Sequence, residues 1–160
     1  VVATAGSAEK CAACRELGAD LAVNYRETDF VSAVKESSGG RGADVILDMV
    51  GGDYMQRNVR AAAEEGRIVP IAFLHGSKAE PDLMPLMLKR LVFTGSTLRA
   101  RSADFKAALA RTVEQNVWPL VESGRVHPRI ARVFPLNEAA AAHALMESSA
   151  HIGKIVLRVD

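Results

Sequence analysis

Apolar residues gather in short runs along the chain, and most of these runs are uninterrupted rather than alternating. Strand-like runs cover residues 1–4, 21–24, 45–49, 68–72, 91–96 and 154–159. Uninterrupted apolar strands are typical of parallel sheets that are covered on both faces. Helical patterns lie between them, at residues 7–17, 29–37, 53–64, 85–89, 103–122 and 137–148. This alternation predicts an α/β fold with a doubly wound parallel sheet.

The order of elements changes after residue 124. His127 and Pro128 are followed by a short apolar run, an Ala-rich helix and the last strand. We therefore expect two parts: a sheet domain at residues 1–124, and a segment at residues 125–160 that packs elsewhere. The chain begins at Val1, inside a strand pattern and without Met, so we expect the natural N-terminus to lie upstream.

Composition and charge narrow the classes of function. The chain has 160 residues, 49% of them hydrophobic, which suffices for a buried core. Lys+Arg 20 against Asp+Glu 19 gives a net charge of +1, so the charge does not favour nucleic acid or an anionic membrane. No apolar run approaches the roughly 20 residues that span a bilayer, and no signal-peptide pattern is present. We expect a cytoplasmic protein.

The two cysteines do not indicate a metal or disulfide site. Cys11 and Cys14 lie in one predicted helix and suit a reducing compartment. A closed zinc site needs four ligands, and no second pair or histidine cluster completes one. We expect no metal in this chain.

The residues that follow the first strand indicate a nucleotide site, because parallel sheets bind ligands beyond the carboxyl ends of their strands. Gly6 would let a phosphate approach the backbone, Ser7 is an N-cap, and Lys10 adds positive charge one turn later. An NAD-selective Rossmann site usually has Asp or Glu after its second strand, and none follows residues 1–4. The pattern predicts NADP(H). Lys10 alone could also be a solvated helix lysine.

Other candidates are less specific. Tyr25 directly follows a strand and could cover an adenine or belong to the core. Arg99 and Arg101 follow the run at residues 91–96 and could clamp a phosphate or a substrate carbonyl, or lie on the surface. The glycine-rich loop G-x-G-x-x-G does not occur; Gly42 ends a glycine cluster that precedes a strand.

Several blocks, in order and spacing, resemble a known family. They are residues 4–10, 17–20, 24–26, 42–52, 66–69 and 151–157. Together they are similar to the zinc-independent quinone oxidoreductases of the medium-chain dehydrogenase/reductase superfamily, above all to the p53-inducible quinone oxidoreductases and their bacterial relatives. The resemblance implies that the chain is the C-terminal, coenzyme-binding portion of such an enzyme. It would be a Rossmann-like domain without its first strand and glycine loop, followed by a segment that returns to the catalytic domain.

The resemblance also implies site residues and a reaction. Hydride would pass from NADPH to a quinone or an enone, since the cofactor carries the chemistry and the protein orients it. The implied cofactor-binding residues are Gly6, Ser7, Lys10, Tyr25, Val50, Phe73, Leu74, Leu98 and His151. Catalytic residues of the absent domain cannot be named from this chain. Relatives often form homodimers through the last sheet strand, here residues 91–96.

Two other functions stay open. One is an enoyl-thioester reductase on the same scaffold, as in polyketide synthases. The other is a module that binds a nucleotide without catalysis, since half a cleft cannot orient two reactants.

Overall fold

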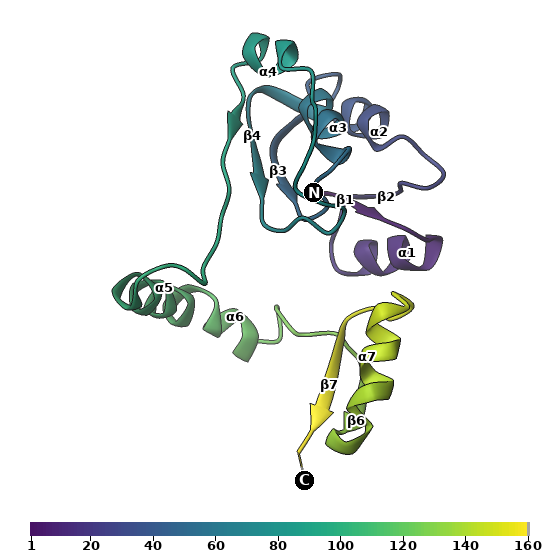
Figure 1. Ribbon diagram of the computed structural model, residues 1–160, viewed down its shortest axis with the longest axis vertical. Helices are drawn as coiled ribbons and strands as arrows, with labels where there is room; N and C mark the ends of the chain where they lie inside the picture. The colour runs from purple at the N-terminus through teal and green to yellow at the C-terminus, as the bar shows by residue number, and fades with distance from the viewer. Residues whose placement is uncertain (160) are drawn as a thin grey trace. The chain divides into compact units, whose positions relative to one another are not determined.

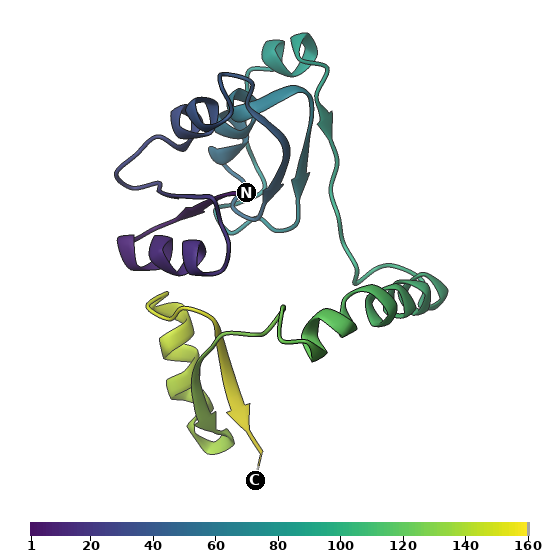
Figure 2. The ribbon, with the colours of Figure 1, turned by 180° about the vertical axis from the view of Figure 1, so that it is seen from behind.

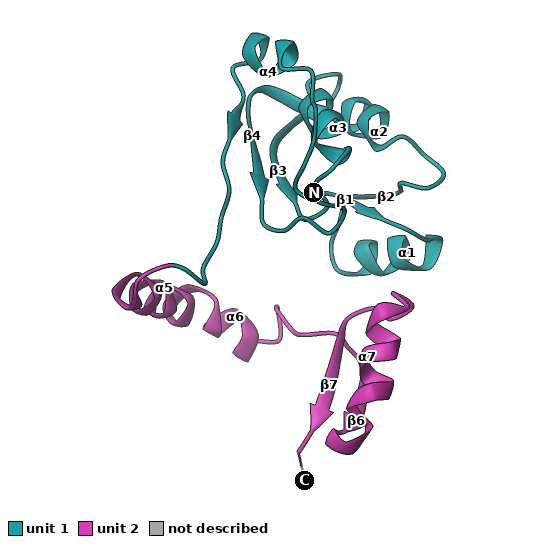
Figure 3. Cartoon of the chain, in the orientation of Figure 1, with its two compact units in different colours: residues 1–100 teal, residues 101–160 magenta. Residues whose placement is uncertain are grey.

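The computed structural model describes residues 1–159, and the chain forms two compact units (Figure 3). Unit 1 is Val1–Ala100 and unit 2 is Arg101–Asp160. The expected division after residue 124 falls inside unit 2, because the helices at residues 103–122 pack on each other there. The expected segment 125–160 ends on Asp160, which lies outside the described residues. The assignment of functions to the two parts stays a prediction.

Unit 1 alternates strands and helices along the chain (Figure 1). Its elements are β1 (Val2–Ala5), α1 (Ala8–Glu16), β2 (Leu21–Asn24), α2 (Phe30–Ser37), β3 (Ala43–Asp48), α3 (Tyr54–Ala61), β4 (Ala62–Pro70), α4 (Met84–Leu88) and β5 (Val92–Phe93). Every strand pair is parallel. The predicted α/β class is confirmed.

The strands of unit 1 form two sheets instead of one. β1 pairs with β2, while β3, β4 and β5 pair in that order. A dinucleotide-binding sheet usually has the strand order 3-2-1-4-5-6. If β1 and β2 are the second and third strands of that order, β3 to β5 are the fourth to sixth. The strand that would join β1 to β3 has no counterpart among residues 1–159.

Two small apolar clusters hold unit 1 together. Val59 and Ile68 are fully buried beside Leu91, and Phe30 and Tyr54 pack with Val23. One face of β3 departs from the expectation of strands covered on both sides. Val45 and Leu47 point to that face and are 64% and 63% exposed. The opposite face carries Ile46, which packs on both clusters.

The junction of α3 and β4 differs from the predicted helix at residues 53–64, which is too long. The helix ends at Ala61, and β4 starts at once because Ala62 pairs with Ala43. Lys89 caps three backbone carbonyl groups at this helix end. Its Nζ donates to the carbonyls of Val59, Arg60 and Ala62 at 3.0, 3.0 and 2.8 Å.

Unit 2 contains a helix pair and a compact βαβ motif, visible from both sides in Figures 1 and 2. Its elements are α5 (Ala103–Asn116), α6 (Trp118–Glu122), β6 (Ile130–Pro135), the 3-10 turn η1 (Leu136–Glu138), α7 (Ala139–Glu147) and β7 (Lys154–Arg158). The single helix expected at residues 103–122 is wrong, because the helix breaks at Val117 and α6 restarts with Pro119 in its first turn. β6 and β7 pair in parallel and α7 packs on both. Within residues 1–159, no helix has the length and apolar character needed to cross a membrane.

Candidate cofactor site

Gly6 lies at the carboxyl end of β1, directly beneath two side chains from the end of β2. A β-carbon built on Gly6 would lie 2.8 Å from Tyr25 Oη and 3.4 Å from Arg26 Nε. Any larger residue at this position would force these side chains to move, so the arrangement favours glycine. The absence of a side chain on Gly6 leaves the phenol of Tyr25 and the guanidinium of Arg26 close to its half-buried backbone.

Ser7 and Lys10 stand at the N-terminus of α1, next to Gly6. Ser7 is the N-cap, as expected, and its Oγ accepts a hydrogen bond from the backbone N–H of Lys10 at 3.2 Å. The hydroxyl keeps its own proton for a second partner. The helix N-terminus, the hydroxyl donor and Lys10 favour an anion electrostatically, whereas the carboxylate of Glu9 in the same turn opposes one.

A row of aromatic rings packs against Tyr25. The rings of Tyr25 and Tyr54 meet edge to face with centroids 6.1 Å apart, and Tyr54 lies 5.2 Å from Phe30. The guanidinium of Arg57 covers Phe30 at 4.1 Å and pairs with Asp29 at 3.4 Å. Burial raises the pKa of Tyr54 above its usual value, and the charge of Arg57 opposes that rise only in part. Tyr54 is thus a neutral packing surface for Tyr25.

The loop after β3 is fixed by the buried carboxylate of Asp48. Its Oδ1 accepts hydrogen bonds from the backbone N–H groups of Val50 at 2.8 Å and Gly51 at 3.3 Å. Asp48 is only 5% exposed, so these bonds satisfy a group that water reaches poorly. The carboxylate determines the direction in which the chain leaves β3.

The loops after β3 and β4 are joined backbone to backbone. Leu74 N–H donates to Met49 O at 3.0 Å, and His75 N–H donates to Val50 O at 2.8 Å. A β-carbon on Gly51 would lie 2.5 Å from the backbone oxygen of Gly76 and 2.7 Å from Phe73 Cδ1, and the φ of Gly51 is positive, so glycine is required there. The structure therefore brings three predicted residues together: Val50, Phe73 and Leu74. Phe73 and Leu74 are 50% and 73% exposed and form an apolar surface at this sheet edge.

The last two predicted residues lie elsewhere. Leu98 follows β5 and is about half exposed. Two residues earlier, the N–H of Ser96 donates to Pro70 O at 3.1 Å. His151 belongs to unit 2, just before β7. Its Nδ1 is buried and has no hydrogen-bond partner among residues 1–159. A buried imidazole nitrogen of this kind suits a polar ligand atom.

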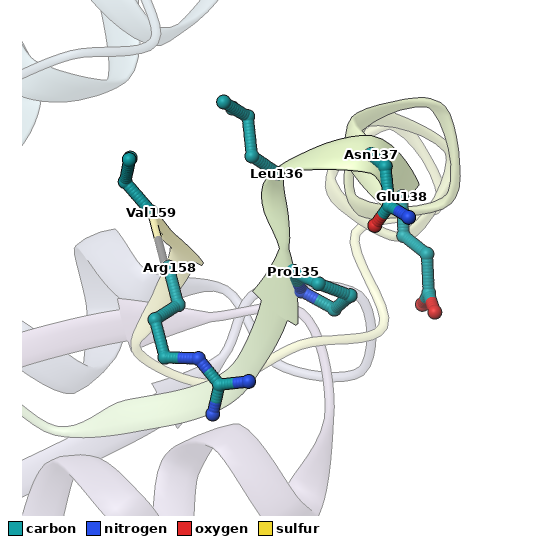
Figure 4. Close-up of a pocket in the computed structure, with 6 residues that line it drawn as sticks. All are labelled: Pro135, Leu136, Asn137, Glu138, Arg158 and Val159. Carbon is teal, nitrogen blue, oxygen red and sulfur yellow. The ribbon is translucent and has the colours of Figure 1, made fainter.

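Unit 2 also has a shallow hollow of about 480 Å³ where β6 and β7 end (Figure 4). It is lined by the last residue of β6, Pro135, by the three residues of η1, by the last residue of β7, Arg158, and by Val159 directly after it. None of the predicted cofactor residues belongs to it.

Arg26 is the site residue that the sequence did not single out. It lies beside Gly6, although neighbouring residues of an extended chain point in opposite directions. The only signal in the sequence was its position after Tyr25 at a strand end.

No metal cluster forms in the described part of the chain. Within residues 1–159, no three side chains of His, Cys, Asp or Glu are grouped to hold an ion. Cys11 is buried and Cys14 half-buried, and both are free thiols. The expectation of no bound zinc stays a prediction.

Comparison with known proteins decides the family. Residues 17–157 match the family described as zinc-binding dehydrogenase. The chain belongs to this family. Quinone oxidoreductase-like protein 2 of Bos taurus is 32% identical over 161 residues, which cover 98% of this chain and 45% of that protein. The resemblance to the quinone oxidoreductases is thereby confirmed.

Solved structures of two oxidoreductases have a similar fold. Escherichia coli quinone oxidoreductase complexed with NADPH has a TM-score of 0.83 and 29% identity, over 98% of this chain and 48% of that one. An NAD-dependent alcohol dehydrogenase has a TM-score of 0.80 and 32% identity, over 100% and 44%. Because solved relatives include both coenzyme types, the coenzyme of this chain must be argued from its own residues.

The share of each relative that the chain covers differs widely. The chain spans about half the length of the curated oxidoreductases it matches. It is also 31% identical, over 162 residues, to the highly reducing polyketide synthase cm3B of Cordyceps militaris, covering 99% of the chain and 6% of that protein. This zinc-binding dehydrogenase segment therefore occurs in proteins of very different size.

Proposed function

We propose that this chain is the coenzyme-binding part of an NADPH-dependent, zinc-independent oxidoreductase that reduces a quinone or a related conjugated carbonyl. The observation that carries the proposal is the arrangement around Gly6. Its bare backbone lies beneath Tyr25 and beside the N-terminus of α1, a shape that admits a phosphate group.

The 2′-phosphate end of the cofactor would be held by Gly6, Ser7, Lys10 and Tyr25. Ser7 donates its hydroxyl proton, while its oxygen keeps the N-cap bond to Lys10 N–H. β1 ends at Ala5 without the carboxylate that would accept from a free ribose 2′-hydroxyl and repel a phosphate. The Tyr25 ring, supported by Tyr54, would lie along the adenosine.

The redox end would lie over the joined loops. Val50, Phe73 and Leu74 offer apolar contact to the ribose and nicotinamide, and Leu98 and His151 are the other two proposed cofactor-binding residues. When bound, NADPH supplies the hydride, and the protein supplies orientation and a dry surface. His151 is proposed because its buried Nδ1 has no hydrogen-bond partner within residues 1–159 and so suits a polar ligand atom.

The proposal extends to assembly and location. Among residues 1–159, β5 pairs only with β4. Its outer edge is therefore unpaired and can pair with a second copy of the chain. We infer a cytoplasmic homodimer formed through residues 91–96. Its substrates would be small quinones or enones.

A second reaction is supported by the similarity to the cm3B polyketide synthase, namely reduction of an enoyl thioester. The test uses the complete protein that contains this chain. NADPH absorbance is followed with 1,4-benzoquinone and, separately, with crotonyl-CoA. Quinone-dependent oxidation supports the first reaction, and oxidation with crotonyl-CoA alone supports the second. Tight NADPH binding without either activity would indicate a nucleotide-binding module.

A further inference from the structure

Arg26 is held in place by the turn that ends β2. Its backbone N–H donates to Asn24 Oδ1 at 3.2 Å. The carbonyl of Asn24 accepts from Glu27 N–H at 3.1 Å and Thr28 N–H at 2.9 Å. Asn24 therefore closes the turn with both its side chain and its backbone, a role that suits asparagine. The direction of the Arg26 side chain follows from this fixed backbone.

The turn sends two consecutive side chains to the same place. The N–H of Tyr25 donates to Ala5 O at 3.1 Å, which holds Tyr25 against the end of β1. The Arg26 guanidinium returns toward Gly6, so that its Nε lies within 3.4 Å of the point where a β-carbon would stand. In residues 1–159, no carboxylate forms an ion pair with Arg26. Its charge is thus not neutralised by a described acidic side chain.

We propose that Arg26 is a ligand of the cofactor 2′-phosphate, beside Lys10, and that it sets the preference for NADPH over NADH. The proposal rests on the NADPH site proposed above. A guanidinium presents several N–H donors in a planar fork, which matches the oxygen atoms of a phosphate. NADH has a hydroxyl at this position and offers no charge to the guanidinium.

The test measures the dissociation constants of NADPH and NADH for the complete protein and three variants. Arg26→Gln removes the charge, Arg26→Lys keeps it, and Arg15→Gln is the matched control. Arg15 lies exposed in the last turn of α1, at the opposite end from Ser7. Arg26→Gln should weaken NADPH binding about tenfold and change NADH binding by less than about twofold. Arg26→Lys should recover part of the loss, and Arg15→Gln should change neither constant.

Two results would overturn the inference, and they are distinguishable. If the unaltered protein prefers NADPH but Arg26→Gln behaves like Arg15→Gln, then Arg26 is a solvated surface arginine and the NADPH site still stands. If the unaltered protein binds both cofactors equally, the NADPH site itself fails. Unchanged NADH binding by Arg26→Gln is the internal control for folding.

Discussion

The phenolic oxygen of Tyr25 lies 2.8 Å from the position that a β-carbon on Gly6 would occupy. Gly6→Ala should therefore displace the Tyr25 ring from Tyr54, a contact typically worth about 0.5 to 1.5 kcal/mol. We expect the free energy of unfolding to fall by about 1 kcal/mol and NADPH binding to weaken, because the methyl group also fills the phosphate position. Urea unfolding and cofactor titration measure the two effects.

Gly95→Ala is the control for that substitution. Its β-carbon would meet only Pro70 O, at 3.8 Å, and Gly95 does not have a positive φ. Because Gly95 lies in the strand proposed to join two copies of the chain, the comparison uses cofactor binding alone, which Gly95→Ala should leave nearly unchanged. Equal effects of the two substitutions would show that the Gly6 contact with Tyr25 has no special role.

The buried carboxylate of Asp48 provides a second test, on the loop that carries Val50. Asp48→Ala leaves the N–H groups of Val50 and Gly51 without their acceptor, so we expect a loss of about 1 to 3 kcal/mol. Asp48→Asn keeps an oxygen acceptor at that position, so it should lower the free energy of unfolding by less than Asp48→Ala does. Chemical denaturation of both variants measures the difference. A cost of Asp48→Asn as large as that of Asp48→Ala would contradict the assigned hydrogen bonds.

Asp29 gives a test by pH. Burial by itself raises the pKa of Asp29, but hydrogen bonds from Ser32, Val31 and Arg57 outweigh it, so the pKa lies below the ordinary value of 3.8. The stabilisation is therefore present above pH 3.8 and is lost as pH falls through the lower, folded-state pKa. Asp29→Ala should cost about 1 kcal/mol at neutral pH, the usual value of an N-cap.

The difference between Asp29→Ala and the unaltered protein should shrink as the pH falls below 3.8. Asp53 is the matched control, because it stands at the N-cap of α3 without a side-chain capping bond. Asp53→Ala should cost little at any pH. Thermal melts of both variants are measured from pH 2 to pH 7. If Asp29→Ala lowers the stability by the same amount over this whole range, the ionised carboxylate of Asp29 is not what stabilises the helix.

Much of this local structure follows from the sequence. Ser7 as an N-cap and Gly6 as a backbone opening were both indicated by residue type and position, because caps and close approaches need few residue types. The break before α6 could also have been found, since Pro119 marks it. A proline in a helical pattern marks a helix start or a break, even where the apolar spacing continues through it.

Other features depend on partners that local sequence does not contain. Ala61 to Glu65 are good helix formers, yet β4 begins at Ala62 because pairing with β3 outweighs propensity. The position of Arg26 beside Gly6 results from the turn that Asn24 closes. The hydrogen bond between Leu74 and Met49 joins two loops that are far apart in sequence. Such contacts are visible only in three dimensions.

The isolated 160 residues should associate. β1 and β3 each have one edge without a partner among residues 1–159, and Val45 and Leu47 are exposed beside one of these edges. Unpaired strand edges and exposed apolar side chains recruit other chains. We expect multimers or aggregates in size-exclusion chromatography and no quinone-dependent NADPH oxidation. A monomer that binds NADPH at micromolar concentrations would contradict this and favour a nucleotide-binding module.

The most direct test of the proposed cofactor site is the effect of Lys10→Ala on NADPH and NADH binding by the complete protein, measured by calorimetric titration. Lys10 lies in the first turn of α1, capped by Ser7. Loss of its charge should weaken NADPH binding by about 1 to 3 kcal/mol and leave NADH binding nearly untouched. Equal losses for the two cofactors would remove Lys10 from the phosphate site and contradict the assignment of NADPH.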